Sequence, residues 1–469
     1  MSLPEDNSSL VKSDRKYIWH PFTQMREWEM QEPIIISEGR DCYLRDISGR
    51  WYLDGVSSLW VNIFGHRKKE LDEAIKTQLD RISHSTLLGL SNPPAIRLAE
   101  RLVKTVNASL LARPASGGSG KEDLLSLSKV FYSDNGSTAV EVALKMAFQY
   151  WQHLGEQTRT AFLSLNNAYH GDTLGAVSVG GVEIFHRAFG PLLFKTHKAP
   201  SPYCYRCELG RKYPDCGLFC ADRMEEILSN HHQEIAAVII EPLVQAAGGM
   251  IVSPPGYLKR VRELCSKYRT LMIADEVATG FGRTGRMFAC GHEAVVPDIM
   301  CLSKGITGGY MPLAVTLATE EIYGAFLGEF RDLKTFFHGH SYTGNPLACA
   351  AALACLDLFD KEETVRHMQP RISLLEERLK EMEPLPHVGT VRNKGLMAGI
   401  ELVKDKGTKE PYAWEEKMGW QVAYSARDNG VIIRPLGNVV VIMPPLNICL
   451  DDLRRLLDVI RDAIIMVTR

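Results

Sequence analysis

Short apolar runs alternate with longer amphipathic stretches through the middle of the chain. The apolar runs span residues 130–132, 236–240, 271–274 and 298–302. They lack polar alternation, which is typical of strands buried on both faces of a parallel sheet. Helical periodicity separates them, most clearly over residues 137–151 and 257–268. This pattern predicts an α/β domain with a mostly parallel sheet.

The chain from residue 346 onward carries a different pattern. A long charged helix is predicted over residues 366–383, followed by strands at 396–400 and 438–443. Near the N-terminus, alternation over residues 41–46 predicts another strand. This combination suits a smaller α+β domain. The Gly- and Ser-rich stretch at residues 113–121 is predicted to be a surface insertion.

Composition adds limits on the class of protein. Of 469 residues, 45% are hydrophobic and 23% are charged, as in ordinary soluble globular proteins. A net charge of -2 argues against a dedicated nucleic-acid binder. No apolar stretch reaches the roughly 18 residues of a membrane-spanning helix, and residues 1–13 do not resemble a secretory signal. We therefore expect a cytoplasmic protein without membrane or nucleic-acid partners, whose 11 cysteines are mostly core residues.

Reactive residues follow three of the predicted strands, where α/β sheets bind their ligands. Gly136 and Ser137 begin a helix, whose free N–H groups suit a phosphate. Asp275 ends one apolar run and Lys304 follows the next. Singly, each feature has an ordinary explanation as a helix cap or a surface lysine.

Together these groups match the requirements of pyridoxal phosphate. The cofactor needs a lysine that attacks its carbonyl carbon and later shuttles protons. It also needs a carboxylate that keeps the pyridine nitrogen protonated, so that the ring accepts electrons. A non-enzymatic binding protein of this fold would not need both Asp275 and Lys304. The sequence therefore predicts a pyridoxal-phosphate enzyme.

Longer motifs resemble the class III aminotransferases of fold type I. They are DEVATGFGRTG at residues 275–285 and LSKGITGG at residues 302–309. Other motifs resemble one branch, the diaminopelargonate aminotransferases of biotin synthesis: WHPFTQ at 19–24, AYHGD at 168–172, HGHSYTGN at 338–345 and IRPLG at 433–437. The resemblance implies a large pyridoxal-phosphate domain at residues 68–345. It also implies a small α+β domain built from both termini, residues 1–67 and 346–469.

The resemblance implies a role for each matching residue around the cofactor. Lys304 would form the internal aldimine, Asp275 would pair with the pyridine nitrogen, and Tyr169 would lie against cofactor and substrate. The other cofactor-binding residues would be Gly136, Ser137, His170, Glu241, His340 and Ser341. Of these, His340 and Ser341 would reach the cofactor phosphate of a partner subunit. The resemblance thus implies a homodimer with its active site at the interface.

Substrate contacts are implied in the same way. Arg434 would bind the substrate carboxylate in a two-pronged contact, assisted by Arg283. Gly339 would touch the substrate. The pocket would be lined by Phe22, Trp60, Tyr169 and Lys304. The implied reaction is a ping-pong conversion of 8-amino-7-oxononanoate to 7,8-diaminononanoate, with another class III ω-aminotransferase or an aminomutase as the alternatives.

The amino donor is the point where this chain departs from the family pattern. Members that use S-adenosylmethionine carry Tyr at the position of Phe22 and a Trp-Trp pair where this chain has Leu59 and Trp60. A sulfonium donor with an adenine ring gains about 0.5–2 kcal/mol from such aromatic faces. The family norm predicts S-adenosylmethionine, whereas the local residues favour L-lysine, which stays as the alternative donor.

Three further motifs carry weaker signals. Residues 280–285 fit G-x-G-x-x-G, but no helix is predicted after them, so we interpret them as a loop that presents Arg283. We interpret His231 and His232 as a solvated helix face. A structural zinc site is compatible with the spacing of four cysteines, although we favour an insertion without metal: Cys204, Cys207, Cys216 and Cys220.

Overall fold

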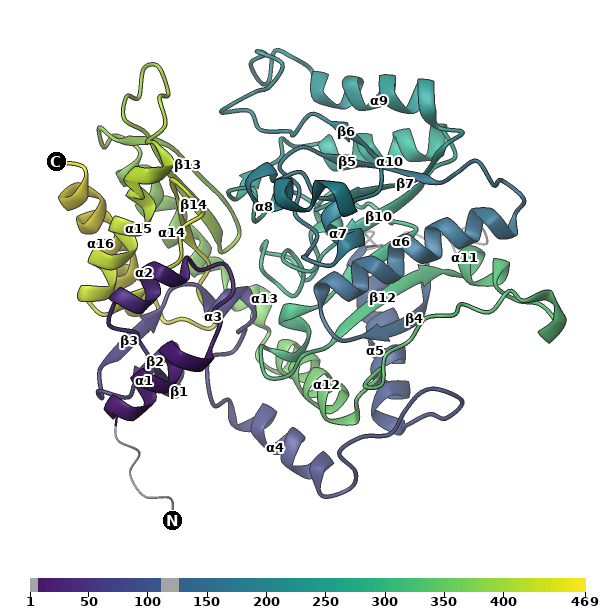
Figure 1. The fold of residues 1–469 in the computed structure, drawn as a ribbon, viewed down its shortest axis with the longest axis horizontal. Helices are drawn as coiled ribbons and strands as arrows, with labels where there is room; N and C mark the ends of the chain where they lie inside the picture. Colours follow the sequence, from purple (N-terminus) through teal and green to yellow (C-terminus); the bar gives the residue numbers. More distant parts are fainter. Residues whose placement is uncertain (1–6, 111–125) are drawn as a thin grey trace.

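A seven-stranded sheet forms the centre of the larger domain (Figure 1). The computed structural model describes residues 7–110 and 126–469, so the insertion predicted at 113–121 lies outside the described residues. The strand order is β4 (Leu127–Ser133), β12 (Ala314–Thr319), β11 (Ile299–Leu302), β10 (Leu271–Asp275), β7 (Ile235–Ile240), β5 (Ala161–Leu165) and β6 (Thr196–Ala199). Only β12 runs antiparallel to its neighbours in this sheet. The predicted α/β fold with a mostly parallel sheet is confirmed.

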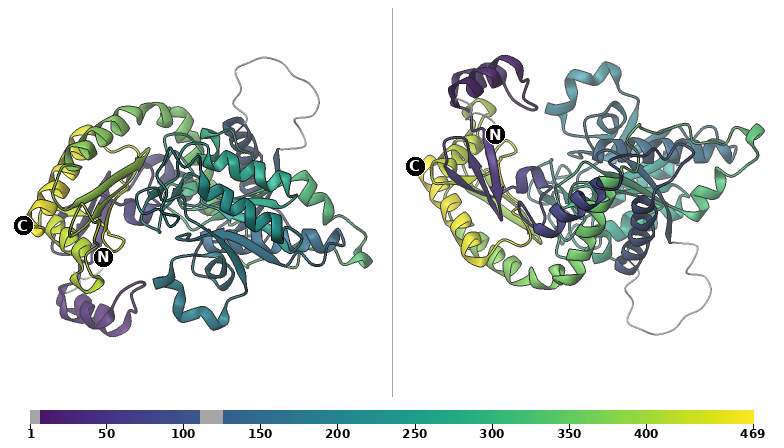
Figure 2. Two further views of the ribbon diagram at one scale, coloured as in Figure 1. Left: turned by 90° about the horizontal axis from the view of Figure 1, so that it is seen from above. Right: turned by 90° about the horizontal axis from the view of Figure 1, so that it is seen from below.

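The larger domain has helices on both sides of this sheet, as two further views show (Figure 2). They are α4 (Lys69–Leu79), α5 (Pro93–Leu110), α6 (Gly136–His153), α7 (Leu174–Val179), α8 (Glu183–His186), α9 (Phe219–His231), α10 (Tyr257–Lys267), α11 (Glu320–Ala325) and α12 (Pro346–Lys361). A short hairpin follows β7, formed by β8 (Val244–Gln245) and β9 (Ile251–Val252). Helix α12, which the predicted boundary assigns to the small domain, packs against α4 and α5 of the larger domain.

The central strands are buried on both faces. On one face, Ile239 of β7 and Ile273 of β10 belong to an apolar cluster shared with α6. On the other face, Val238 and Met272 belong to a second cluster, shared with α10. Successive side chains of a strand point to opposite sides, so every position of these strands meets a core. This is why the apolar runs of the sequence lack polar alternation.

The small domain combines an N-terminal and a C-terminal segment of the chain, whose purple and yellow ribbons lie side by side in Figure 1. Its first sheet contains β1 (Ile36–Arg40), β2 (Tyr43–Asp46), β3 (Trp51–Asp54) and, parallel to β3, β15 (Val431–Ile432). The second sheet contains β13 (Val388–Lys394), β14 (Met397–Leu402) and β16 (Val439–Ile442). Its helices are α1 (Asn7–Tyr17), α2 (Met25–Met30), α13 (Thr364–His367), α14 (Gln369–Met382), α15 (Met418–Asp428) and α16 (Leu450–Val467). The short helix α3 (Ser57–Trp60) leads from β3 toward the larger domain.

The helix predicted over residues 366–383 is divided into α13 and α14 at Met368. Pro370 occupies the first turn of α14. Proline has no N–H group and its ring clashes with the carbonyl of the residue four positions earlier, so it favours a helix start over a helix interior.

Among the helices of residues 7–110 and 126–469, none combines the length and apolar character needed to cross a membrane.

Candidate active site

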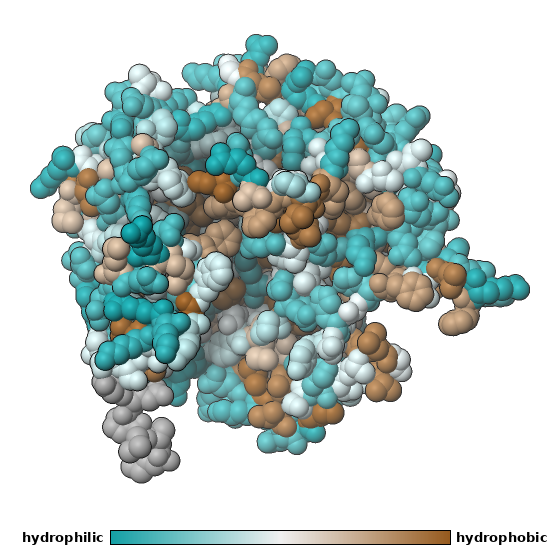
Figure 3. Space-filling model, viewed as in Figure 1, coloured by the Kyte–Doolittle hydropathy of each residue, from teal (hydrophilic) through white to brown (hydrophobic). Residues whose placement is uncertain are grey.

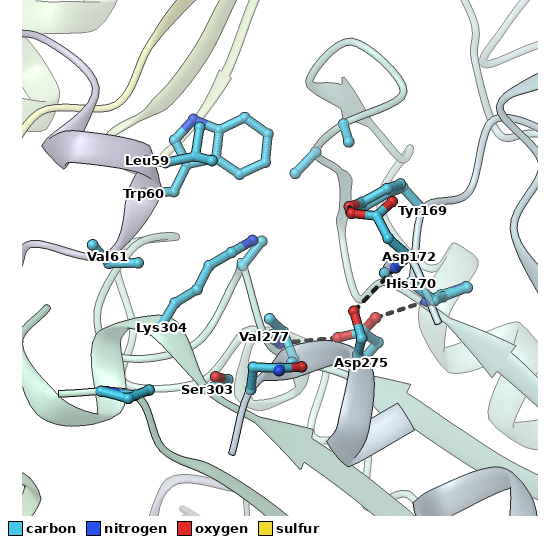
Figure 4. Close-up of a pocket in the computed structure, with 18 of the residues that line it drawn as sticks. Leu59, Trp60, Val61, Tyr169, His170, Asp172, Asp275, Val277, Ser303 and Lys304 are labelled. Atoms are coloured by element: carbon cyan, nitrogen blue, oxygen red, sulfur yellow. Dashed lines mark hydrogen bonds and ion pairs between the residues drawn. The ribbon is translucent and has the colours of Figure 1, made fainter. Parts of the chain in front are cut away.

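The carboxyl ends of the parallel strands bring the predicted reactive residues around one cavity. Lys304 follows β11, Asp275 ends β10, Glu241 follows β7, and Tyr169 lies in the loop after β5. The cavity between them has a volume of about 740 Å³ (Figure 4). Because parallel strands end at the same edge of a sheet, residues far apart in the sequence meet here.

Lys304 points its amine into this cavity. It begins a single 3-10 turn in the left-handed conformation, with φ 49°. Its Nζ lies 4.8 Å from the centre of the Trp60 ring (Figure 4). Burial lowers the pKa of the Lys304 amine, although Asp275 and Glu241 act in the opposite direction. A lowered pKa favours the neutral amine, which is the nucleophilic form.

Asp275 is held in a fixed orientation at the end of β10. Its Oδ2 lies 2.7 Å from His170 Nδ1, and its Oδ1 accepts a hydrogen bond from Val277 N at 3.1 Å. The residue is 4% exposed. A buried carboxylate is costly unless it is paired, and these two partners supply part of that compensation. The arrangement can hold a carboxylate against a protonated ring nitrogen.

Helix α6 begins at the wall of the cavity, with Gly136 and Ser137 in its first turn. Asn135 caps it, since its side chain accepts the N–H of Thr138 at 3.1 Å. The first N–H groups of a helix lack intrahelical acceptors, so this end attracts an anion such as a phosphate. A side chain does not fit at residue 136, because a Cβ there would lie 2.6 Å from Val277 Cγ1.

The Tyr169 loop is tied to two elements. Glu241, after β7, accepts the N–H groups of Tyr169 at 3.0 Å and of Ala246 at 2.9 Å. Burial raises the pKa of Glu241 to about 8. The Tyr169 hydroxyl donates to Asp172 Oδ2 at 2.7 Å, and the Asp172 N–H donates to Ser137 Oγ at 3.0 Å. The loop therefore spans from the end of β7 to the start of α6.

Arg283 lies elsewhere than predicted. Its side chain is buried, with the residue only 1% exposed. Its Nη1 and Nη2 donate to the carbonyl oxygens of Pro444 at 2.7 Å and Asn62 at 2.8 Å. The predicted loop at residues 280–285 is present, but it presents Arg283 to the main chain. Because these carbonyls occupy both ends of the guanidinium, Arg283 joins segments of the chain instead of facing a substrate carboxylate.

Three other predicted substrate residues lie outside the described lining of the cavity, namely Arg434, Phe22 and Gly339. Arg434 follows β15 and is half-buried, with its guanidinium carbon 5.6 Å from the centre of the Trp420 ring. The ring of Phe22 is 5.4 Å from that of Phe185, which in turn lies 6.2 Å from Tyr169. Trp60, in contrast, lines the cavity, together with the neighbouring Leu59.

The segment at residues 338–341 lies against the pocket of its own chain. His340 Nδ1 is 2.7 Å from Asp134 Oδ2, and Asp134 lines the cavity. Gly339 and Ser341 are exposed. Several lining residues were not predicted from the sequence, namely Asp134, Asn135, Ala246, Val277, Tyr310 and Met311. The sequence offers one indication of them, which is that they lie close in the chain to the predicted residues Gly136, Glu241, Asp275 and Lys304.

The four spaced cysteines line a separate small cavity of about 20 Å³: Cys204, Cys207, Cys216 and Cys220. Within the part of the chain that the structure describes, the one group of three ligand atoms within 4.8 Å of one another consists of His197, His231 and Glu234.

The fold and the cavity define a pyridoxal-phosphate enzyme of fold type I. A helix start that excludes a Cβ fits a phosphate, a fixed buried carboxylate fits a pyridine nitrogen, and a desolvated lysine fits the carbonyl carbon. The chain belongs to the family Aminotransferase class-III, whose model matches residues 24–464. The predictions of this family, of a pyridoxal-phosphate cofactor and of an aminotransferase are confirmed.

Individual relatives are similar over nearly the whole chain. The adenosylmethionine-8-amino-7-oxononanoate aminotransferase of Geobacter sulfurreducens is 55% identical over 464 residues, which cover 99% of each chain. The crystal structure of the enzyme of the same name from Methanocaldococcus jannaschii is 46% identical, with a TM-score of 0.90 over 98% of this chain and 99% of that one. A PLP-bound amine transaminase from an uncultivated Pseudomonas species is 37% identical, with a TM-score of 0.87 over 96% and 98% of the two chains.

Proposed function

We propose that this enzyme converts 8-amino-7-oxononanoate to 7,8-diaminononanoate in biotin biosynthesis, with S-adenosylmethionine as amino donor. One observation carries the proposal: Lys304, Asp275 and the start of α6 meet in one cavity. The Geobacter sulfurreducens relative, named for this substrate and donor, is 55% identical over 99% of the chain. The test is to supply the purified holoenzyme with both substrates and to measure 7,8-diaminononanoate. Its absence with every donor offered would refute the proposal.

Each of the residues around the cavity has a separate role in the proposed reaction. Pyridoxal phosphate, when bound, supplies an electron-accepting ring and a carbon that exchanges amines. Lys304 would hold that carbon through its amine and, when a donor amine takes its place, would move a proton at the donor's reacting carbon. Asp275, oriented by His170 and the Val277 N–H, keeps the ring nitrogen protonated. Gly136 and Ser137 hold the phosphate.

Arg434 is the proposed partner of the substrate carboxylate. In the described residues its guanidinium forms no ion pair with an acidic side chain, although the residue is half-buried. Burial lowers the pKa of Arg434. A half-buried cation without a counter-ion favours an anionic ligand, and a guanidinium suits a carboxylate because it can donate two parallel hydrogen bonds.

We also propose a cytoplasmic homodimer with His340 and Ser341 near the partner's cofactor. The segment after α11 carries exposed apolar side chains, including Phe330 at 96% and Phe337 at 73%. It projects from the body of the molecule (Figure 3). An exposed apolar arm of this kind marks an interaction site. All 11 cysteines lie in the described residues and are free, which supports a reducing compartment.

L-Lysine is the second candidate donor, and one observation favours it. Leu59 lines the cavity at a position where an aromatic face would serve an adenine ring, and it is 52% exposed. The deciding experiment mixes the holoenzyme with each donor alone and follows amination of the cofactor by absorbance. Amination of the cofactor by S-adenosylmethionine would support S-adenosylmethionine as the donor. Amination by lysine alone would show that lysine is the donor instead. Leu59→Trp should increase the rate with S-adenosylmethionine relative to lysine.

A further inference from the structure

Two histidines and a glutamate meet at the edge of the large sheet, outside the lining of the active-site cavity. His197 lies on the edge strand β6, His231 ends α9, and Glu234 immediately precedes β7. Glu234 Oε1 is 3.2 Å from His197 Nε2 and 2.6 Å from His231 Nδ1. One ligand atom of each residue lies within 4.8 Å of the other two.

These donors have the chemistry and nearly the spacing of a zinc-type site. Imidazole nitrogen and carboxylate oxygen both bind zinc, at about 2.0–2.2 Å, so donors around a tetrahedral ion lie about 3.3 Å apart. His231 and Glu234 have side chains that are 43% and 44% exposed, which leaves them free to adjust. The side chain of His197 is 14% exposed and is fixed on a strand.

His197 also has an unsatisfied atom that points to a ligand. Its Nε2 is buried and forms no hydrogen bond of good geometry, in spite of the nearby Glu234 oxygen. A buried polar atom without a partner costs free energy, and most such atoms in folded proteins are paired. A metal ion between the three side chains would satisfy this nitrogen.

We propose that His197, His231 and Glu234 bind one divalent ion of the zinc class, with water completing the coordination. The ion would join β6 to the turn between α9 and β7, and so close the loop of residues 197–234. This loop contacts the small domain, since Arg206 Nε donates to Glu401 of β14 at 2.5 Å. The site is structural, because none of its ligands lines the cavity of Lys304.

The experiment uses the holoenzyme without an affinity tag, treated with chelator and then dialysed against Zn²⁺. Wild type should bind one ion per chain. His197→Ala and His231→Ala should each bind at least about tenfold more weakly, because each loses one of three ligands. The matched control is His232→Ala, which should bind as wild type does. This neighbouring histidine contacts the carbonyl of Leu228 and the ring of Tyr268 instead.

A second measurement separates this site from the cysteine segment. Zn²⁺ should raise the thermal midpoint of wild type and of His232→Ala, but not that of His197→Ala. If His197→Ala does not fold, Glu234→Gln takes its place, because that side chain is half exposed. The proposal would be overturned if the variants at His197, His231 or Glu234 still bound one Zn²⁺ per chain as tightly as wild type does. It would also be overturned if wild type bound no Zn²⁺. A Co²⁺ spectrum with a thiolate charge-transfer band would place the ion at the cysteines and overturn it as well.

Discussion

Replacing Gly136 with alanine tests whether the start of α6 requires a residue without a side chain. The added Cβ would lie 2.6 Å from Val277 Cγ1, 3.3 Å from Cγ2 and 3.5 Å from Cβ. Non-bonded carbon atoms prefer separations of about 3.5–4.0 Å, so α6 or residue 277 must move by roughly 1 Å. The Val277 N–H donates to Asp275 Oδ1, and this movement therefore also disturbs the carboxylate.

The expected cost follows from this overlap. Overpacking of one methyl group in a tight site costs about 1–3 kcal/mol. If the cost falls on the cofactor-bound state, the affinity for pyridoxal phosphate drops about 5- to 150-fold. Titration of the apoenzyme with cofactor, followed by absorbance, measures this change. Val277→Ala removes both Cγ atoms and leaves the nearest carbon at 3.5 Å, so adding it to Gly136→Ala should restore most of the affinity.

Two comparisons make the result decisive. Gly324→Ala, in α11, should leave the cofactor affinity unchanged, because a Cβ there meets nothing within 4 Å. The double variant is compared with Val277→Ala alone, since that substitution has its own packing cost. A Gly136→Ala enzyme with both the thermal midpoint and the cofactor affinity of wild type, or a double variant no better than Gly136→Ala in either measurement, would refute the steric reasoning.

Three other substitutions test the proposed roles. Lys304→Ala should still bind cofactor through α6 and Asp275 but lose the absorbance of lysine-bound cofactor and nearly all turnover; steady-state activity equal to wild type would contradict the assignment. Arg434→Ala should weaken binding of 8-amino-7-oxononanoate by about 1.5–3 kcal/mol without changing cofactor affinity, and equal acceptor affinity in a calorimetric titration would point to another group. Glu241 has a folded-state pKa of about 8, compared with an ordinary value of 4.5. Its contribution to the free energy of unfolding is therefore fully present below pH 4.5 and is lost as the pH rises to about 8. Glu241→Gln lacks this loss, and its free energy of unfolding should therefore rise relative to wild type between about pH 5 and about pH 8; a constant difference in denaturant titrations would show that the carboxyl is not perturbed.

The sequence by itself determined the order of the elements and the core of the chemistry. Apolar runs without polar alternation predicted strands with a core on each face, which is how β7 and β10 are buried. Lys304, Asp275 and Gly136 could be identified because each ends such a strand or follows one within three residues. Parallel strands end at one edge of their sheet, so local position along the chain was enough to predict that these groups meet.

Only the tertiary structure decided which long-range partners each side chain has. Arg283 was predicted to face the substrate, yet it is bound by the carbonyls of Asn62 and Pro444, which are distant in the chain. His340 pairs with Asp134 across 206 positions. No local pattern contains such pairings, because they depend on how two domains and several loops pack. For the same reason, the sequence did not predict that His231 lies close to His197. Helical periodicity predicts only that His231 is on a solvent-exposed face of its helix. The neighbouring strand comes close to that face only in the folded chain.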